Sequence, residues 1–207
     1  MSRSEPIELG LTIPLQRHLH IKALPYSQEP DRRFCWDLHV ITLRGRPSLL
    51  AVHCHSRYTF VLYDLSRLEW ERLPDVFREG LERSLSAAGF PAEAADLRCG
   101  DCQPLFTKTP GRREVAFLNR AWDDVMAADL LCGSDQPLFT KTHGRREVAF
   151  LNRAWDDVMA AELALDESAQ SQPLLDQIVN AQPSRCVGFE GLGSAVERLA
   201  DTLRKLI

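Results

Sequence analysis

The sequence predicts a single α+β domain in which an antiparallel sheet meander packs against helices, with a duplicated strand–helix unit. Strand-like segments come first, helical segments come later, and strand–helix units are mixed in, which together favour this class. The chain has 207 residues, of which 44% are hydrophobic and 26% charged. This composition is typical of globular proteins, and the length allows one large or two small domains.

The first third of the chain has the patterns of short strands. Apolar residues and turn signals predict strands at 7–12, 36–43, 49–55 and 58–64, a short helix at 14–21 and a polar loop at 27–33. The residues Arg44-Gly45-Arg46-Pro47 predict a turn between two of these strands. The last three strands are therefore expected to form an antiparallel meander.

Helix signals follow the strands. Ser66 and Glu69 have the spacing of a capping box, and Pro74 suits the start of a longer helix that Gly89 ends. Its inward residues are expected to be Leu73, Val76, Phe77, Leu81 and Leu85. Near the carboxyl terminus, a polar linker at 166–172 precedes helical segments near 173–180 and 194–206, so residues 165–207 form a C-terminal helical segment.

Residues 99–131 and 132–164 are two copies of one 33-residue block. They are identical at 28 positions and differ at five: 101/134, 102/135, 110/143, 129/162 and 131/164. Solenoid repeats share a sparse pattern instead of near-identity, so we interpret this as a recent tandem duplication. Without the second block the chain has 174 residues, which suits one domain over 1–207 that carries an extra unit.

Each copy predicts a short strand followed by a helix. In the first copy the strand covers 104–109, Gly111 breaks it, and a helix runs from about Arg112 to Leu130. Val115, Leu118, Trp122, Val125 and Met126 lie on one helical stripe. Phe117 and its counterpart Phe150 are expected to point away from that stripe.

Three arrangements of the two copies are open. The second copy can add a strand and helix beside the first, one copy can dock in a neighbouring chain and give a swapped homodimer, or one copy can be looped out. A looped-out copy would expose Trp122 or Trp155, so we rank this arrangement last. We rank the added strand and helix slightly ahead of the swapped homodimer.

Charge and cysteine content narrow the class of protein. The chain has 25 basic and 29 acidic residues, and its net charge of −4 disfavours nucleic acid as the main partner. An export signal and a membrane-spanning run are both lacking, so we expect a cytoplasmic protein with six reduced cysteines. Cys99, Cys102, His53 and His55 could form a metal set, but the second copy breaks the CxxC pair, and we expect no metal and no cofactor.

A candidate anion site lies at the start of each repeated helix. Backbone N–H groups, the helix dipole and nearby cations can together hold a phosphate or carboxylate. A solvated basic turn is the alternative interpretation. We expect Trp36 and His39 to converge with this set, so the candidate ligand-binding residues are Trp36, His39, Lys108, Thr109, Arg112, Asn119, Lys141, Thr142, Arg145 and Asn152.

These motifs resemble a family of small bacterial and phage-encoded domains of unknown function. The residues that carry the resemblance are Trp36-x-x-His39-x-x-Thr42, Tyr58-Thr59-Phe60, and Phe106-Thr107-Lys108-Thr109-x-x-Arg112 with Asn119. The similarity covers roughly residues 7–130. The chain departs from the family pattern where Arg120 follows Asn119 and where His39 replaces an asparagine. The resemblance implies a compact α+β domain and supplies no reaction.

We therefore expect a cytosolic bacterial binding module for an anionic small molecule, a nucleotide or a protein partner. Two other functions remain open. One is a nuclease or phosphotransfer enzyme that uses His39 and the Lys/Arg cluster. The other is an interaction protein of the toxin–antitoxin or phage-defence kind. A homodimer through the duplicated unit is a further expectation.

Overall fold

The computed structural model describes residues 7–21, 24, 31–91, 140–141, 145–186 and 188–205, with the side chains of 140–141 and 145–148 left out. The first repeat, residues 99–131, therefore lies outside the described residues. Within the second repeat, the structure describes a short strand, a helix and a 3₁₀ turn.

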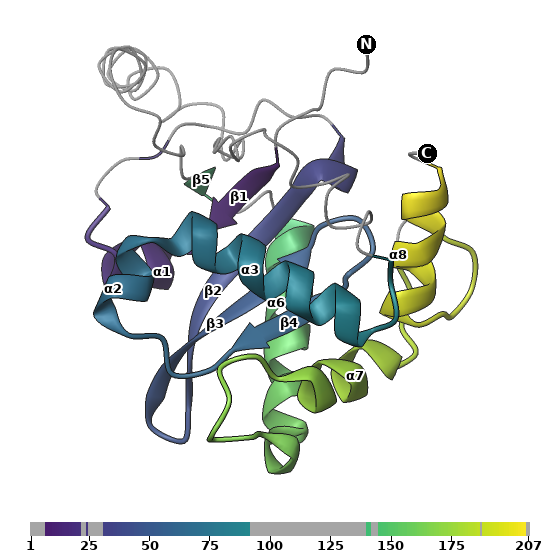
Figure 1. The fold of residues 1–207 in the computed structure, drawn as a ribbon. Helices are drawn as coiled ribbons and strands as arrows, with labels where there is room; N and C mark the ends of the chain where they lie inside the picture. Colours follow the sequence, from purple (N-terminus) through teal and green to yellow (C-terminus); the bar gives the residue numbers. More distant parts are fainter. Residues whose placement is uncertain are drawn as a thin grey trace, which may run out of the picture.

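A five-stranded mixed sheet forms the centre of the molecule (Figure 1). Its order is β4-β3-β2-β1-β5. The antiparallel pairs β2/β3 and β3/β4 confirm the predicted meander. The first strand pairs in parallel with β2, and β5 pairs in parallel with β1, so the sheet is mixed. The strands are β1 (Glu8–Leu11), β2 (Cys35–Leu43), β3 (Arg46–His53), β4 (Thr59–Leu62) and β5 (Thr140–Lys141).

Helices cover both faces of this sheet. Helix α3 crosses the near face in Figure 1 and α6 runs behind the strands, while α7 and α8 lie toward the right of the view. The helices are α1 (Ile13–His18), α2 (Arg67–Glu71), α3 (Leu73–Ala87), α6 (Arg145–Ala160), α7 (Pro173–Ala181) and α8 (Ala195–Arg204), with 3₁₀ turns η1 (Arg32–Phe34) and η2 (Glu162–Ala164). These observations confirm the α+β class.

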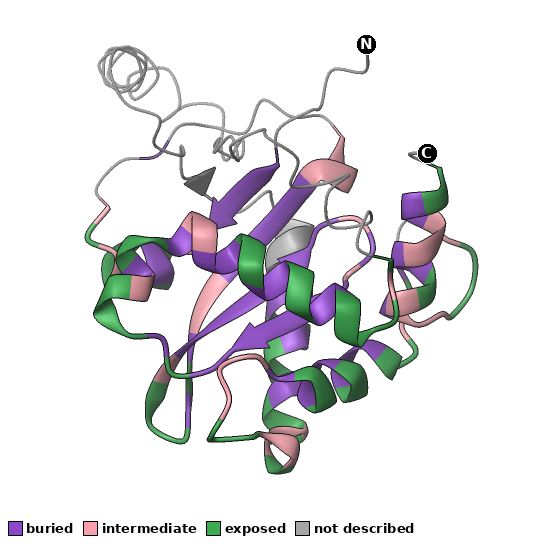
Figure 2. Cartoon of the chain, in the orientation of Figure 1, coloured by how far each residue is buried: buried purple, intermediate pink, exposed green. Residues whose placement is uncertain are grey.

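Two hydrophobic cores lie on opposite faces of the sheet, and the strands are buried while the outer faces of the helices are exposed (Figure 2). The core under α3 contains Trp36 and Leu38 of β2, whereas the core under α6 contains Ile41 and Leu43 of the same strand. This division follows the alternation of side chains along a strand. Phe150 belongs to the second core and is 7% exposed, so the expectation that it points away from the core is wrong.

The free edge of β4 is covered by polar side chains of α7. Asn180 accepts a hydrogen bond from the Thr59 N–H (2.8 Å) and donates one to the Thr59 carbonyl (2.6 Å). One turn earlier on α7, Asp176 accepts a hydrogen bond from the Val61 N–H at 2.9 Å. The backbone groups of an edge strand are a template for unwanted pairing, and these two side chains occupy them.

Candidate functional site

Trp36 and His39 do not converge. Trp36 is fully buried in the core under α3, where its ring contacts those of His53, Phe60 and Phe77. His39 lies three residues further along β2, so its side chain projects from the opposite face of the sheet. Its ring meets that of Trp155 on α6, with 5.5 Å between the centroids. The structure therefore separates the two residues that the sequence analysis groups.

His39 contacts Thr12, the residue that caps α1. Its Nδ1 lies 2.8 Å from the Thr12 hydroxyl, and burial lowers the pKa of the imidazole below its ordinary value.

The repeated basic residues can be placed in part. Lys141 lies in β5 and Arg145 begins α6, while Asn152 is exposed on the outer side of that helix. The side chains of Lys141 and Arg145 lie outside the described residues. So do Thr142 and the four candidates of the first repeat, Lys108, Thr109, Arg112 and Asn119.

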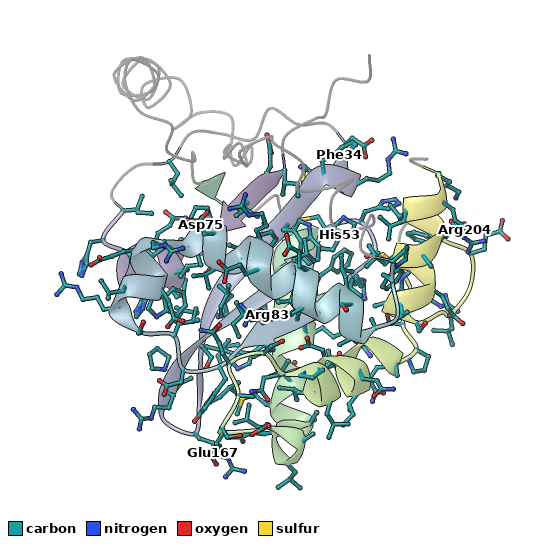
Figure 3. The ribbon with its side chains drawn as sticks, in the orientation of Figure 1. Phe34, His53, Asp75, Arg83, Glu167 and Arg204 are labelled. Carbon is teal, nitrogen blue, oxygen red and sulfur yellow. The ribbon has the colours of Figure 1, made fainter. Side chains whose placement is uncertain are left out.

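His53 of the suggested metal set is engaged elsewhere. The Nε2–H of His53 donates to the Arg33 carbonyl (3.0 Å), and its Nδ1 accepts from the backbone N–H (3.2 Å) and hydroxyl (2.7 Å) of Ser56. Figure 3 shows the labelled His53 in the interior, in contrast to Glu167 and Arg204 at the rim. Within the described ranges, no cluster of three or more His, Cys, Asp or Glu side chains could hold a metal ion. Cys99 and Cys102 lie outside those ranges.

Arg57 sits in the turn between β3 and β4 with an unusual backbone. Its φ of +64° lies in the left-handed region, which is uncommon for residues other than glycine. The Arg57 N–H donates to the His53 carbonyl (2.9 Å), and its own carbonyl accepts from the Thr59 hydroxyl (3.1 Å). Such conformations persist where the surroundings hold them, and they concentrate at functional sites.

The guanidinium of Arg57 forms no ion pair among the described residues, although the carboxylate of Asp157 is near enough to interact with its charge. It stacks on the Phe150 ring, with 3.6 Å from Cζ to the centroid, and its buried Nε makes no hydrogen bond. Burial lowers the pKa of Arg57, the hydrogen-bonded side chain of Cys186 opposes this change, and the positive charges of Arg198 and Arg153 lower the pKa further. A fixed, partly desolvated cation of this kind is a strong partner for an anion.

Arg198 joins the Arg57 turn to the loop that precedes α8. It is 4% exposed, and its guanidinium donates to the carbonyls of Ser56 (3.0 Å), Ser184 (2.9 Å) and Gly193 (2.6 Å). Ser184 and Gly193 also form a backbone bridge, which closes the loop. Cys186 within this loop donates to the His55 carbonyl at 3.1 Å. The loop is therefore fixed against the turn at several points.

An open groove lies between the turn and this loop. It has a volume of about 460 Å³, and its described lining residues are Arg57, Arg185, Cys186, Phe189 and Gly191. On the other side of Arg57, a small cavity of about 20 Å³ is lined by residues that include Arg153, Asp157 and Arg198. The described lining of the two spaces thus contains four arginines and one carboxylate. We call this region the Arg57 groove.

Sequence reasoning did not find the Arg57 groove. Its residues come from a turn, a helix and a loop far apart in the sequence, and they form no motif. One weak signal was present, a glycine cluster at Gly188, Gly191 and Gly193. Gly188 and Gly191 have φ values of +87° and +71°, so they allow the loop to turn around the groove.

The fold and this groove define an α+β domain with an arginine-lined depression beside the β3–β4 turn. The chain belongs to the family described as a domain of unknown function (DUF6933), whose model matches residues 8–136, more than half of the chain. This match confirms the resemblance drawn from the sequence. No curated protein matches the chain. None of the described helices has the length and apolar character needed to cross a membrane.

Proposed function

We propose that the chain is a binding module for an anionic small molecule and that the anion binds at the Arg57 groove. The observation that carries this proposal is the Arg57 guanidinium, which is held over Phe150 and faces an open groove without an ion-pair partner among the described residues. The surrounding arginines give the groove a positive potential, which favours and attracts anions. The proposed site differs from the start of α6 that the sequence analysis favoured.

The lining of the groove favours a ligand that combines an anion with a flat ring. Phe189 lines the groove, and its ring lies 5.0 Å from that of His55 between centroids. Arginine binds phosphate through two parallel hydrogen bonds, and aromatic side chains stack on rings. A nucleotide offers both groups, so we propose a phosphate on Arg57 and Arg185 and a base against Phe189.

Titration of the full chain with adenosine and guanosine monophosphates and with inorganic phosphate tests this proposal. The variant Arg57→Asn removes the guanidinium, while asparagine tolerates the left-handed backbone. We expect nucleotide affinity to fall at least about tenfold, since a charge-assisted hydrogen bond contributes roughly 1.5–3 kcal/mol. Isothermal calorimetry and thermal shift provide the measurement.

Arg44→Asn is the matched control. Arg44 is also an arginine with a left-handed backbone, φ +47°, but it lies in the β2–β3 turn, and its guanidinium approaches Glu162 at 3.3 Å. This variant should bind as the parent does. Equal affinity in Arg57→Asn and the parent would refute the proposed site, and an absence of binding to all three probes would refute the ligand class.

A further inference from the structure

The second repeat occupies one defined place on the sheet. Its strand β5 pairs with the edge of β1 through Gly10↔Thr140 and Leu11↔Lys141. Its helix α6 packs on the side of the sheet where Leu50, Val52 and Val61 are buried. We call this combination of sheet edge and sheet face the repeat seat.

The residues that fill the repeat seat are the same in both repeats. The buried side chains of α6 are Phe150, Leu151, Ala154 and Val158, and Trp155 contacts His39. Their counterparts 33 positions earlier are Phe117, Leu118, Ala121, Val125 and Trp122, all identical. Of the five positions that differ, two fall in the described part of the second repeat, Glu162 and Ala164, and neither is buried.

The family match covers the first repeat and only the first residues of the second. The matched segment, residues 8–136, contains the whole first repeat and ends before β5 begins at Thr140. In the structure, however, the strand beside β1 comes from the second repeat. The family pattern thus spans the first repeat, whereas the described sheet contains the strand of the second.

We infer that the repeat seat is a docking surface for either repeat, so that residues 99–131 can occupy it in place of residues 132–164. When the second repeat fills the seat, the first is a 33-residue insertion before the seated strand and helix. After an exchange, the second repeat is a 33-residue insertion after them. Loop-closure entropy depends weakly on loop length, so the two arrangements are close in free energy. Of the two described differences, Glu162 pairs with Arg44 (3.3 Å) at the surface, and a pair that is open to solvent contributes little.

This inference does not depend on the proposed function, although it affects the Arg57 groove. Phe150 and Arg153 contribute to that region from α6. Their counterparts Phe117 and Arg120 are identical, so either seated repeat would complete it.

Charged substitutions in the full-length chain test the inference. Val158 is fully buried under α6, so an aspartate there prevents the second repeat from docking. We expect Val158→Asp to keep one cooperative thermal transition, with a midpoint within about 4 °C of the parent, because the first repeat takes the seat. Val125→Asp should behave in the same way, and the double variant should lose the transition.

Two results would overturn the inference. In the first, Val158→Asp alone is as damaging as the double variant, and the seat then accepts the second repeat exclusively. In the second, the double variant unfolds as the parent does, and the seat then needs no repeat.

Fluorine NMR of the 5-fluorotryptophan-labelled chain observes the seated repeat directly. Trp155 contacts the His39 ring, which gives its resonance a distinct environment. In Val158→Asp, the resonance of Trp122 should move to the position that Trp155 has in the parent. Trp122→Phe and Trp155→Phe variants supply the assignments. A folded Val158→Asp chain whose Trp122 resonance does not move would contradict the exchange.

Discussion

Asp176 shows how a single buried carboxyl group can set the pH dependence of this domain. Its oxygens accept hydrogen bonds from the Val61 N–H (2.9 Å) and the Ser84 hydroxyl (2.8 Å), and no described cation pairs with it. Burial raises its pKa to about 8. The neutral, protonated form is therefore favoured in the folded state near neutral pH.

Because the folded pKa of Asp176 lies above the unfolded value, its contribution is fully present below about pH 4 and is lost as pH rises toward 8. The loss is at most about 1.4 kcal/mol per pH unit in this window. Asp176→Asn stays neutral, so its free energy of unfolding should vary less between pH 5 and 8 and exceed the parent value at pH 8. Urea unfolding at several pH values measures this, and the exposed Asp156→Asn is the control. A parent-like pH slope in Asp176→Asn would contradict the assignment.

The composition of a segment predicts which residues are buried better than it predicts which way each side chain points. Trp36 and His39 are expected to be partners, but residues three apart on a strand project from opposite faces. Phe150 is expected to face outward because the helix stripe alone leaves it there. The structure buries Phe150 because Arg57 covers it from a turn more than ninety residues away, and periodicity within one helix cannot report such a contact.

Close packing of α3 on β4 depends on Gly80. A Cβ at this position would lie 2.7 Å and 2.9 Å from the two terminal methyl carbons of Leu62, which is itself fully buried. The glycine therefore allows the helix backbone to approach the strand, at the cost of its low helix propensity.

Gly80→Val should destabilise the domain by about 2 kcal/mol, because overpacking exceeds the gain in helix propensity. Urea denaturation gives the value. Glu82→Val places the same side chain at an exposed position of α3 and should change stability by less than about 1 kcal/mol. Similar losses in the two variants would attribute the effect to valine in a helix and not to packing.

The contact between α7 and the edge of β4 leads to a second prediction about how the helices and strands pack. Asn180→Ala leaves the Thr59 N–H and carbonyl without their partner, so we expect a loss of about 1–3 kcal/mol. The exposed Gln177→Ala on the same helix is the control, and both are measured by urea denaturation. Equal stability of the two variants would show that water replaces the Asn180 contacts without cost.

Elements with local signals could be predicted well from the sequence. The capping box of Ser66 and Glu69 is present, and all five residues expected to face inward from α3 are buried. The parallel pairing of β1 could not be predicted, because the alternation within a strand does not specify its partner or direction. The linker at 166–172 is more ordered than its polar sequence suggests, since the Tyr63 N–H donates to the Gln170 carbonyl at 2.8 Å.

For the whole molecule, the presence of two near-identical repeats predicts that a chain without the first repeat still folds. Deletion of residues 99–131 leaves the second repeat and 15 residues, 92–98 and 132–139, between Pro91 and β5. Fifteen extended residues span roughly 50 Å, which exceeds the size of a domain with a radius of gyration near 16 Å. The 174-residue chain should therefore keep the parent amide NMR pattern for residues 35–62. A spectrum without dispersion would show that the first repeat is needed for folding.

Two features of the whole molecule cannot be predicted from local sequence patterns. Two near-identical blocks are visible in the sequence, but their 28 shared positions predict the same strand and helix, so local patterns do not select which block joins the sheet. The Arg57 groove is similarly a product of assembly, because the 184–193 loop reaches the β3–β4 turn through the Arg198 contacts.

The cover that α7 places on β4 also gives the protein an internal reporter of local opening. The amide protons of Thr59 and Val61 are bonded to side chains of one helix instead of to a neighbouring strand. Both protons should exchange with deuterium at a common rate when α7 detaches. The amides of the same strand that bond to β3 should exchange only when a larger part of the domain opens. Exchange at these two sites therefore measures the detachment of α7 without an added probe group.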